Sequence, residues 1–158
     1  MTENYLKILE ESLEQKLQIM AKIQEYNLRQ QEIFQDRDVN LEEFDKCVDQ
    51  KSALIDELMA LDSGFETLYR NVEQELQNNR QKYAEQIKRL QGLVTRVTEE
   101  SVTIQAQEAR NKKQVEDYFR KERAGIAQNR KNSKAAFDYY RSMSGSDYAT
   151  PQFYDNKK

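Results

Sequence analysis

The chain has 158 residues, of which 34% are charged and 37% are hydrophobic, with four glycines, one proline and no tryptophan. So few turn-forming residues exclude the many tight turns of a β-sandwich or barrel, and the composition is typical of long helices and coiled coils. The single cysteine excludes an intrachain disulfide and a cysteine-based metal cluster, and the lack of histidine removes the commonest general base and metal ligand.

The net charge of −3 is unevenly distributed along the chain. Residues 1–109 carry 13 basic and 22 acidic side chains, a net of −9, whereas residues 110–141 carry 10 and 4, a net of +6. This asymmetry indicates that the end of the chain has a role of its own. No N-terminal apolar run is typical of a signal peptide, and no segment has the length of a membrane span. We therefore expect a cytoplasmic protein with no membrane span.

A first helix is expected over about residues 3–35. Its apolar residues recur at spacings of three and four, which places them on one face. This face consists of Leu6, Leu9, Leu13, Leu17, Met20 and Ile23. The polar stretch 36–40 should end the helix. Asn40 is expected to cap the next helix, with Glu43 at the capping-box position and Val39 and Phe44 as a hydrophobic staple.

A second helix is expected over about residues 41–77. Its apolar face consists of Leu41, Phe44, Val48, Ile55, Leu58, Phe65, Tyr69, Val72 and Leu76. Lys51 and Asp62 interrupt this face. The face continues past Gly64, so we expect the helix to continue to a turn at residues 77–80. Cys47 adjoins Val48 and is interpreted as a small buried hydrophobe rather than a nucleophile.

A third helix is expected over about residues 81–141. Its apolar face consists of Tyr83, Ile87, Leu90, Val94, Val97 and Ile104. From residue 105 to residue 114 the only apolar residues are Ala106 and Ala109. We therefore expect the far part of this helix to project beyond the other two or to be only marginally ordered. The prediction is an all-α, antiparallel three-helix bundle or coiled coil, with one domain at 1–141 and a flexible tyrosine-rich tail at 142–158.

Apolar and aromatic residues gather late in the chain, where no helical face can bury all of them. Six of the fifteen aromatic residues lie between residues 137 and 154. Exposed aromatic clusters beside basic residues are typical of interaction sites. The candidate partner-binding residues are Val115, Tyr118, Phe119, Ile126, Phe137, Tyr139, Tyr140 and Met143. The alternative for Phe137 and Tyr140, whose spacing is also core spacing, is that they fold back onto the bundle.

Two stretches carry a family resemblance: Asn40–Phe44, which reads NLEEF, and Lys51–Leu58, which reads KSALIDEL and is followed by Leu61. They resemble the flagellar export chaperones of the FlgN type, over roughly residues 3–120. The resemblance implies a cytoplasmic chaperone without ATPase activity. It would hold the terminal helices of flagellar hook-associated (hook–filament junction) proteins through the far part of its third helix, residues 105–141, and deliver them to components of the export gate.

The sequence favours no enzymatic activity, no cofactor and no metal. Three alternatives to a junction-protein chaperone stay open. One is a chaperone of the filament cap protein, and another is a structural coiled coil that forms homo-oligomers. The third is a nucleic-acid-binding module, in which bases stack on aromatic residues beside Arg130 and Lys134. The acidic character of residues 1–109 weighs against nucleic acid.

Overall fold

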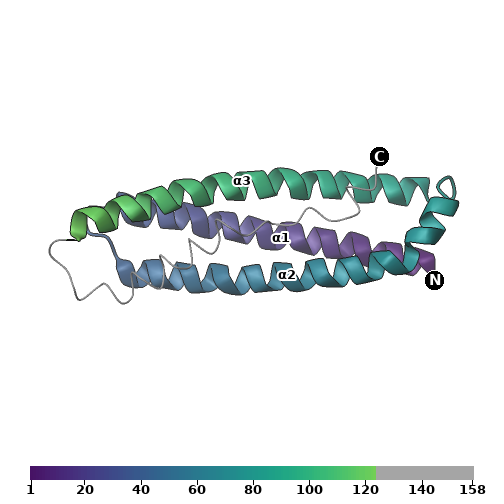
Figure 1. The fold of residues 1–158 in the computed structure, drawn as a ribbon, viewed down its shortest axis with the longest axis horizontal. Coiled ribbons are helices and arrows are strands. Elements are labelled where there is room, and N and C mark those ends of the chain that lie inside the picture. Colours follow the sequence, from purple (N-terminus) through teal and green to yellow (C-terminus); the bar gives the residue numbers. More distant parts are fainter. Residues whose placement is uncertain (124–158) are drawn as a thin grey trace. The chain divides into compact units, whose positions relative to one another are not determined.

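The structure, a computed structural model, describes residues 1–123. These residues form three helices, which are α1 (Thr2–Gln35), α2 (Leu41–Asn78) and α3 (Ala84–Glu122) (Figure 1). The described residues contain no strand. The prediction of an all-α fold built from three helices is therefore confirmed.

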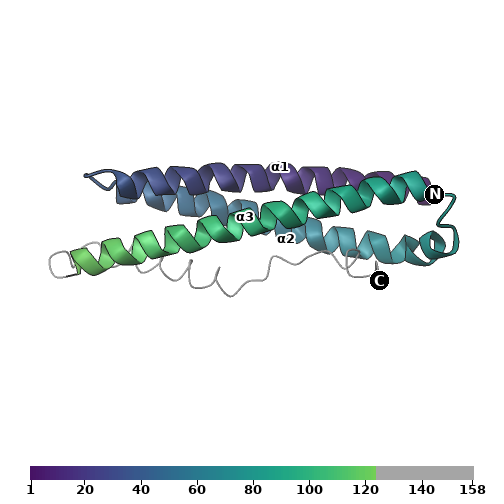
Figure 2. The same ribbon diagram turned by 90° about the horizontal axis from the view of Figure 1, so that it is seen from above.

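The contacts among the described residues cluster into two compact units. Unit 1 contains Met1–Ala21 and Ile55–Ser101, and unit 2 contains Lys22–Leu54 and α3 from Val102 onward. Each unit therefore has one segment of each helix. Within either unit the α1 and α3 segments run in the same direction and the α2 segment runs against them (Figures 1 and 2). Such a division arises because a residue in a long helix contacts only residues near its own level, and the expected single domain at 1–141 stays a prediction.

The connection between α1 and α2 is organised as the sequence predicts, with one change. The Asn40 side-chain Oδ1 accepts a hydrogen bond from the backbone N–H of Glu43 at 3.0 Å, which caps α2. Val39 packs against the apolar cluster that contains Phe44, as a hydrophobic staple does. The Glu43 carboxylate, however, accepts hydrogen bonds from the Arg29 guanidinium of α1. Glu43 thus joins two helices instead of completing a capping box.

Helix α2 continues without interruption past Gly64, as expected, and no described residue has a positive φ. It ends at Asn78, and residues 79–83 form the turn that leads to α3. The Asn79 side-chain amide donates to the carbonyl of Glu75 at 2.9 Å, which satisfies one of the carbonyls left open at the helix end.

Helix α3 departs from the expectation in two ways. It ends at Glu122, with Arg123 in a turn, and does not run uninterrupted to Arg141. Gly125, a poor helix former, follows closely in the sequence. The helix also stays packed beyond Ile104, where the apolar face was expected to stop, because Val115 is buried. The part of α3 after residue 104 therefore belongs to the core of unit 2 and does not project free of it.

Unit 1 has an apolar core to which all three helix segments and the turn contribute. Its buried residues are Leu6, Leu9, Leu13, Ile19, Met20, Leu58, Phe65, Tyr69, Val72, Leu76, Tyr83, Leu90, Val94 and Val97. Asp62, which interrupts the apolar face of α2, forms a salt bridge of 2.5 Å with the buried Lys16 of α1. A charged residue at a core position is thus paired across helices.

The Asn40 cap gives a first prediction. Asn40→Ala removes the acceptor of the Glu43 N–H and should lower the free energy of unfolding by about 1 kcal/mol. The measurement is urea unfolding followed by circular dichroism. Asn71→Ala is the matched control, because Asn71 is exposed in the interior of α2, two turns before its end, where alanine is the better helix former. If Asn40→Ala is as stable as Asn71→Ala, the cap does not contribute.

Candidate functional site

Unit 2 has polar residues at the centre of its core. The buried polar residues are Asn27 and Gln30 of α1, Lys51 of α2, and Gln107, Glu108 and Asn111 of α3. We call this group the polar layer. Buried polar side chains are uncommon, and they are costly unless they are hydrogen-bonded. The partners of these side chains therefore decide what the layer does.

Lys51 is the centre of the polar layer, and its side chain is fully buried. Its Nζ donates to the Glu108 carboxylate at 2.6 Å, to the Asn27 side-chain oxygen at 2.7 Å and to the Gln30 side-chain oxygen at 3.0 Å. An ammonium group has three hydrogens, so all three are donated to side-chain oxygens of α1 and α3. Lys51 therefore joins all three helix segments of unit 2 and has no hydrogen left for a ligand.

The amide side chains extend the polar layer around the lysine. Asn27 Nδ2 donates to the Gln107 side-chain oxygen at 3.0 Å. Asn111 Nδ2 donates to the backbone carbonyl of Asn27 at 3.0 Å and also contacts the Gln30 oxygen at 3.3 Å. The second Glu108 oxygen, Oε2, is buried and accepts no hydrogen bond from the described residues. The layer is thus extensively, though not completely, satisfied.

Burial shifts the pKa of two side chains, those of Lys51 and Cys47, which lie about one helical turn apart on α2. Desolvation lowers the pKa of the Lys51 ammonium from 10.5, and the nearby Glu108 carboxylate acts in the opposite direction. Desolvation is also the main reason why the pKa of the Cys47 thiol is raised from 9.0. Because Cys47 is buried and a thiolate is disfavoured there, its interpretation as a small buried hydrophobe is confirmed.

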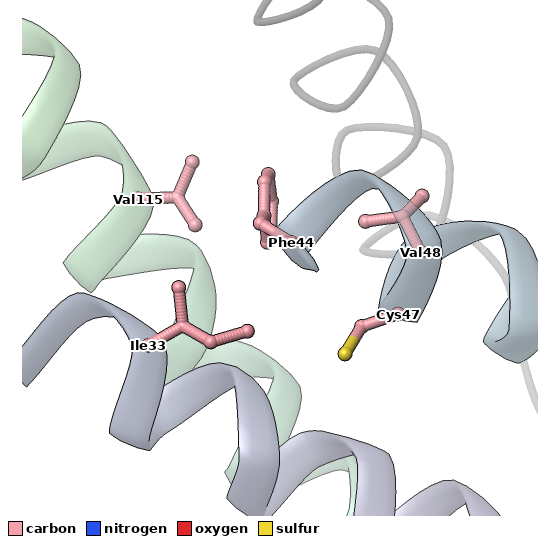
Figure 3. Close-up of a cluster of buried hydrophobic side chains, with 5 residues drawn as sticks. All are labelled: Ile33, Phe44, Cys47, Val48 and Val115. Atoms are coloured by element: carbon pink, nitrogen blue, oxygen red, sulfur yellow. The ribbon is translucent and has the colours of Figure 1, made fainter. Parts of the chain in front are cut away.

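Beside the polar layer, unit 2 has an apolar cluster to which each helix contributes. Its buried members are Ile33 of α1, Phe44, Cys47 and Val48 of α2, and Val115 of α3, and their side chains point toward one another (Figure 3). Val115 is 1% exposed. Its prediction as a partner-binding residue is therefore corrected, because a side chain in the core cannot reach a partner.

Tyr118 and Phe119, the next two candidates, are half-buried at the border of this cluster. The Tyr118 ring lies edge-on to the rings of Phe34, at 5.3 Å between centroids, and of Phe119, at 5.2 Å. Phe34 in turn packs edge-on against Phe44 at 4.8 Å. We call Phe34, Tyr118 and Phe119 the aromatic edge. All three side chains are half-buried, so each is partly held by the core and partly exposed.

The other candidates, Ile126, Phe137, Tyr139, Tyr140 and Met143, lie outside the described residues, as does the tail at 142–158.

Within residues 1–123, no group of three or more acidic, cysteine or histidine side chains could hold a metal ion. None of the three helices is long and apolar enough to cross a membrane. No family model matches the chain, and no curated protein or solved structure matches it significantly.

The pairing of Lys51 with Glu108 predicts a strong coupling between the two positions. Lys51→Met leaves the Glu108 carboxylate buried without its cation and should lower the free energy of unfolding by about 3 kcal/mol. Adding Glu108→Met removes the unpaired charge and should recover at least about 1 kcal/mol of this loss. Urea unfolding of both single variants and the double variant measures the coupling. A double variant less stable than either single variant would contradict the pairing.

The lowered pKa of Lys51 also predicts how stability depends on pH. Between the folded-state pKa and 10.5, the unfolded chain holds the Lys51 proton and the folded chain does not. Stability rises with pH wherever the unfolded state binds more protons. The free energy of unfolding of the wild type, minus that of Lys51→Met/Glu108→Met, should therefore increase as the pH approaches 10.5. Cys47 is present in both proteins, so its titration largely cancels. A flat or falling difference would contradict a lowered pKa.

Proposed function

We propose that this chain binds another protein through the aromatic edge of unit 2, and that it is an export chaperone of the FlgN type. The observation that carries the proposal is the position of the edge. Tyr118 and Phe119 are half-buried and lie against Phe34, near the end of α3. Aromatic side chains that are partly held by their own core and partly open are frequent anchors of protein interfaces.

The charge around the aromatic edge adds to this proposal. Arg120, Lys121 and Arg123 are exposed just after Tyr118 and Phe119, and the basic stretch continues in the sequence to residue 141. An apolar edge beside a stretch of net positive charge, residues 110–141, fits an amphipathic helix whose polar side is acidic. Capture of such a helix by contact with a helical surface is a common mode of peptide recognition.

The proposed substrates are the hook–filament junction proteins, held by their terminal helices until export. The identity of the substrate is supported by the resemblance of residues 40–44 and 51–58 to the FlgN-type chaperones. Tyr118 and Phe119 also lie within residues 105–141, the segment that the resemblance implies for substrate binding. One residue of these stretches also has a part in the fold. Lys51 opens the second of these stretches, and in the structure it holds α3 against α1 and α2 within unit 2.

The test is a calorimetric titration of the full chain with a purified hook–filament junction protein. Tyr118→Ala/Phe119→Ala should weaken binding at least tenfold, which corresponds to about 1.4 kcal/mol, because truncated interface aromatics commonly cost more than this. Val102→Ala is the matched control, since Val102 is apolar and 61% exposed on the same helix. It should bind as the wild type does.

Three results would contradict the proposal. They are no binding by the wild type, equal binding by the double variant, and equal weakening by Val102→Ala. A thermal melt of each variant shows whether a loss of binding is a loss of fold. Titration with the filament cap protein tests the alternative substrate. Sedimentation of the chain alone over a range of concentrations tests self-association, which the chaperone proposal does not require.

A further inference from the structure

Unit 1 has an apolar groove between α1 and α2 that the proposed function does not use. It has a volume of about 290 Å³, and its walls are far more apolar than polar. Leu9 and Phe65 of the core are among the lining residues. Ile8 on α1 and Leu61 and Leu68 on α2 also line the groove, and Ile8 is 48% exposed. We call this site the α1–α2 groove.

Two small residues on α2, Ala60 and Gly64, line the groove on its open side. A Cβ placed on Gly64 would meet no atom within 4 Å, so no close contact in the described structure requires glycine there. Glycine is also the least favourable ordinary residue in a helix interior apart from proline. Glycine at position 64 is therefore unfavourable for α2 itself. Its missing side chain, however, leaves room for the backbone of another molecule to approach α2 closely.

The charge around the groove indicates what kind of molecule fits it. Glu11 is the one charged residue among those that line the groove. Glu57 is exposed one helical turn before Leu61 and so lies on the same face of α2. The described residues of unit 1 as a whole carry 8 basic and 13 acidic side chains. The groove is therefore an apolar slot with Glu11 in its lining and Glu57 near it, in a unit of net negative charge.

We propose that the α1–α2 groove is a docking site for a basic amphipathic helix of a partner protein. One or two aliphatic side chains of that helix would enter between Ile8 and Leu61 and cover Gly64. Its lysine and arginine side chains would face Glu11 and Glu57. A polar small molecule fits the groove less well, because such ligands need several convergent polar groups and this lining offers few.

This docking site is independent of the proposed function. The aromatic edge lies in unit 2 beside a stretch of net positive charge, whereas the groove lies in unit 1, which has a net negative charge. The two surfaces therefore select partner helices of opposite charge, and a variant of one should leave binding at the other unchanged.

The probe is a synthetic helical peptide of about four turns, roughly 14 residues, with leucines on one face and lysines on the other. Its binding to the full chain is measured by fluorescence anisotropy at physiological salt. Two further peptides are controls. One has glutamate in place of lysine, and the other has the same composition in an order that destroys the leucine face. We expect the lysine peptide to bind and neither control to bind measurably.

Gly64→Leu fills the groove and should weaken binding of the lysine peptide at least tenfold. Gly92→Leu is the matched control, because Gly92 is an exposed glycine of α3 in the same unit and its Cβ would also meet nothing within 4 Å. It should leave the affinity unchanged. Glu57→Lys should weaken binding at least threefold, and Glu85→Lys, which carries the same change in net charge on α3, should have a smaller effect.

Ile8→Gln is a second groove variant at a partly exposed position and should also weaken binding. The proposal is overturned if Gly64→Leu binds within twofold of the wild type, or if the reordered lysine peptide binds equally well, which would mean charge attraction alone. It is also overturned if the wild type sediments as a dimer that Gly64→Leu dissociates, because a second copy would then occupy the groove. Gly64→Leu should still bind a junction protein normally, so the two proposals fail separately.

Discussion

The organisation of unit 2 depends on one buried ammonium group, that of Lys51. Its three hydrogens are donated to Glu108, Asn27 and Gln30, which belong to the other two helices. Removing a charge from water is costly, and such a group is tolerated only when its partners are in place. The helix segments of unit 2 can therefore pack in the arrangement that supplies these partners, whereas an arrangement that separates Lys51 from Glu108 leaves two buried charges unpaired.

The apolar part of the fold could be predicted from the sequence because it repeats within each helix. The spacing of Leu6, Leu9 and Leu13 identifies a helical face without knowledge of what covers it. The Asn40 cap is equally local, since donor and acceptor are three residues apart. Asp62 and Lys51 were visible only as interruptions. Each has its main ionic partner on another helix, Lys16 for Asp62 and Glu108 for Lys51, and a pattern read along one helix does not contain such partners.

The polar layer has a signal in the sequence, but a pattern made of apolar residues alone does not contain it. Ile104, Glu108, Asn111 and Val115 follow one another at spacings of four, three and four, so the core register of α3 continues through its polar stretch. Ile23, Asn27 and Gln30 do the same on α1. Polar residues at core positions of all three helices indicate a shared polar layer rather than the end of the core. The continued core register explains why Val115 is buried, while Tyr118 and Phe119, three and four residues further on, are half-buried.

The polar layer also determines where the aromatic edge can lie. Apolar contacts alone distinguish poorly between two registers of α3 that differ by one repeat, because apolar residues recur at equivalent positions in each. A shift of α3 by one seven-residue repeat would place Ser101 or Val115 opposite Lys51 and leave its charge unpaired. Such a shift would also remove Asn111 from the Asn27 carbonyl, which it contacts at 3.0 Å. The pairs of the layer therefore select one register, and in that register Tyr118 lies against Phe34. The surface proposed to bind a partner, built from α1 and α3, thus has its geometry fixed by a lysine on α2.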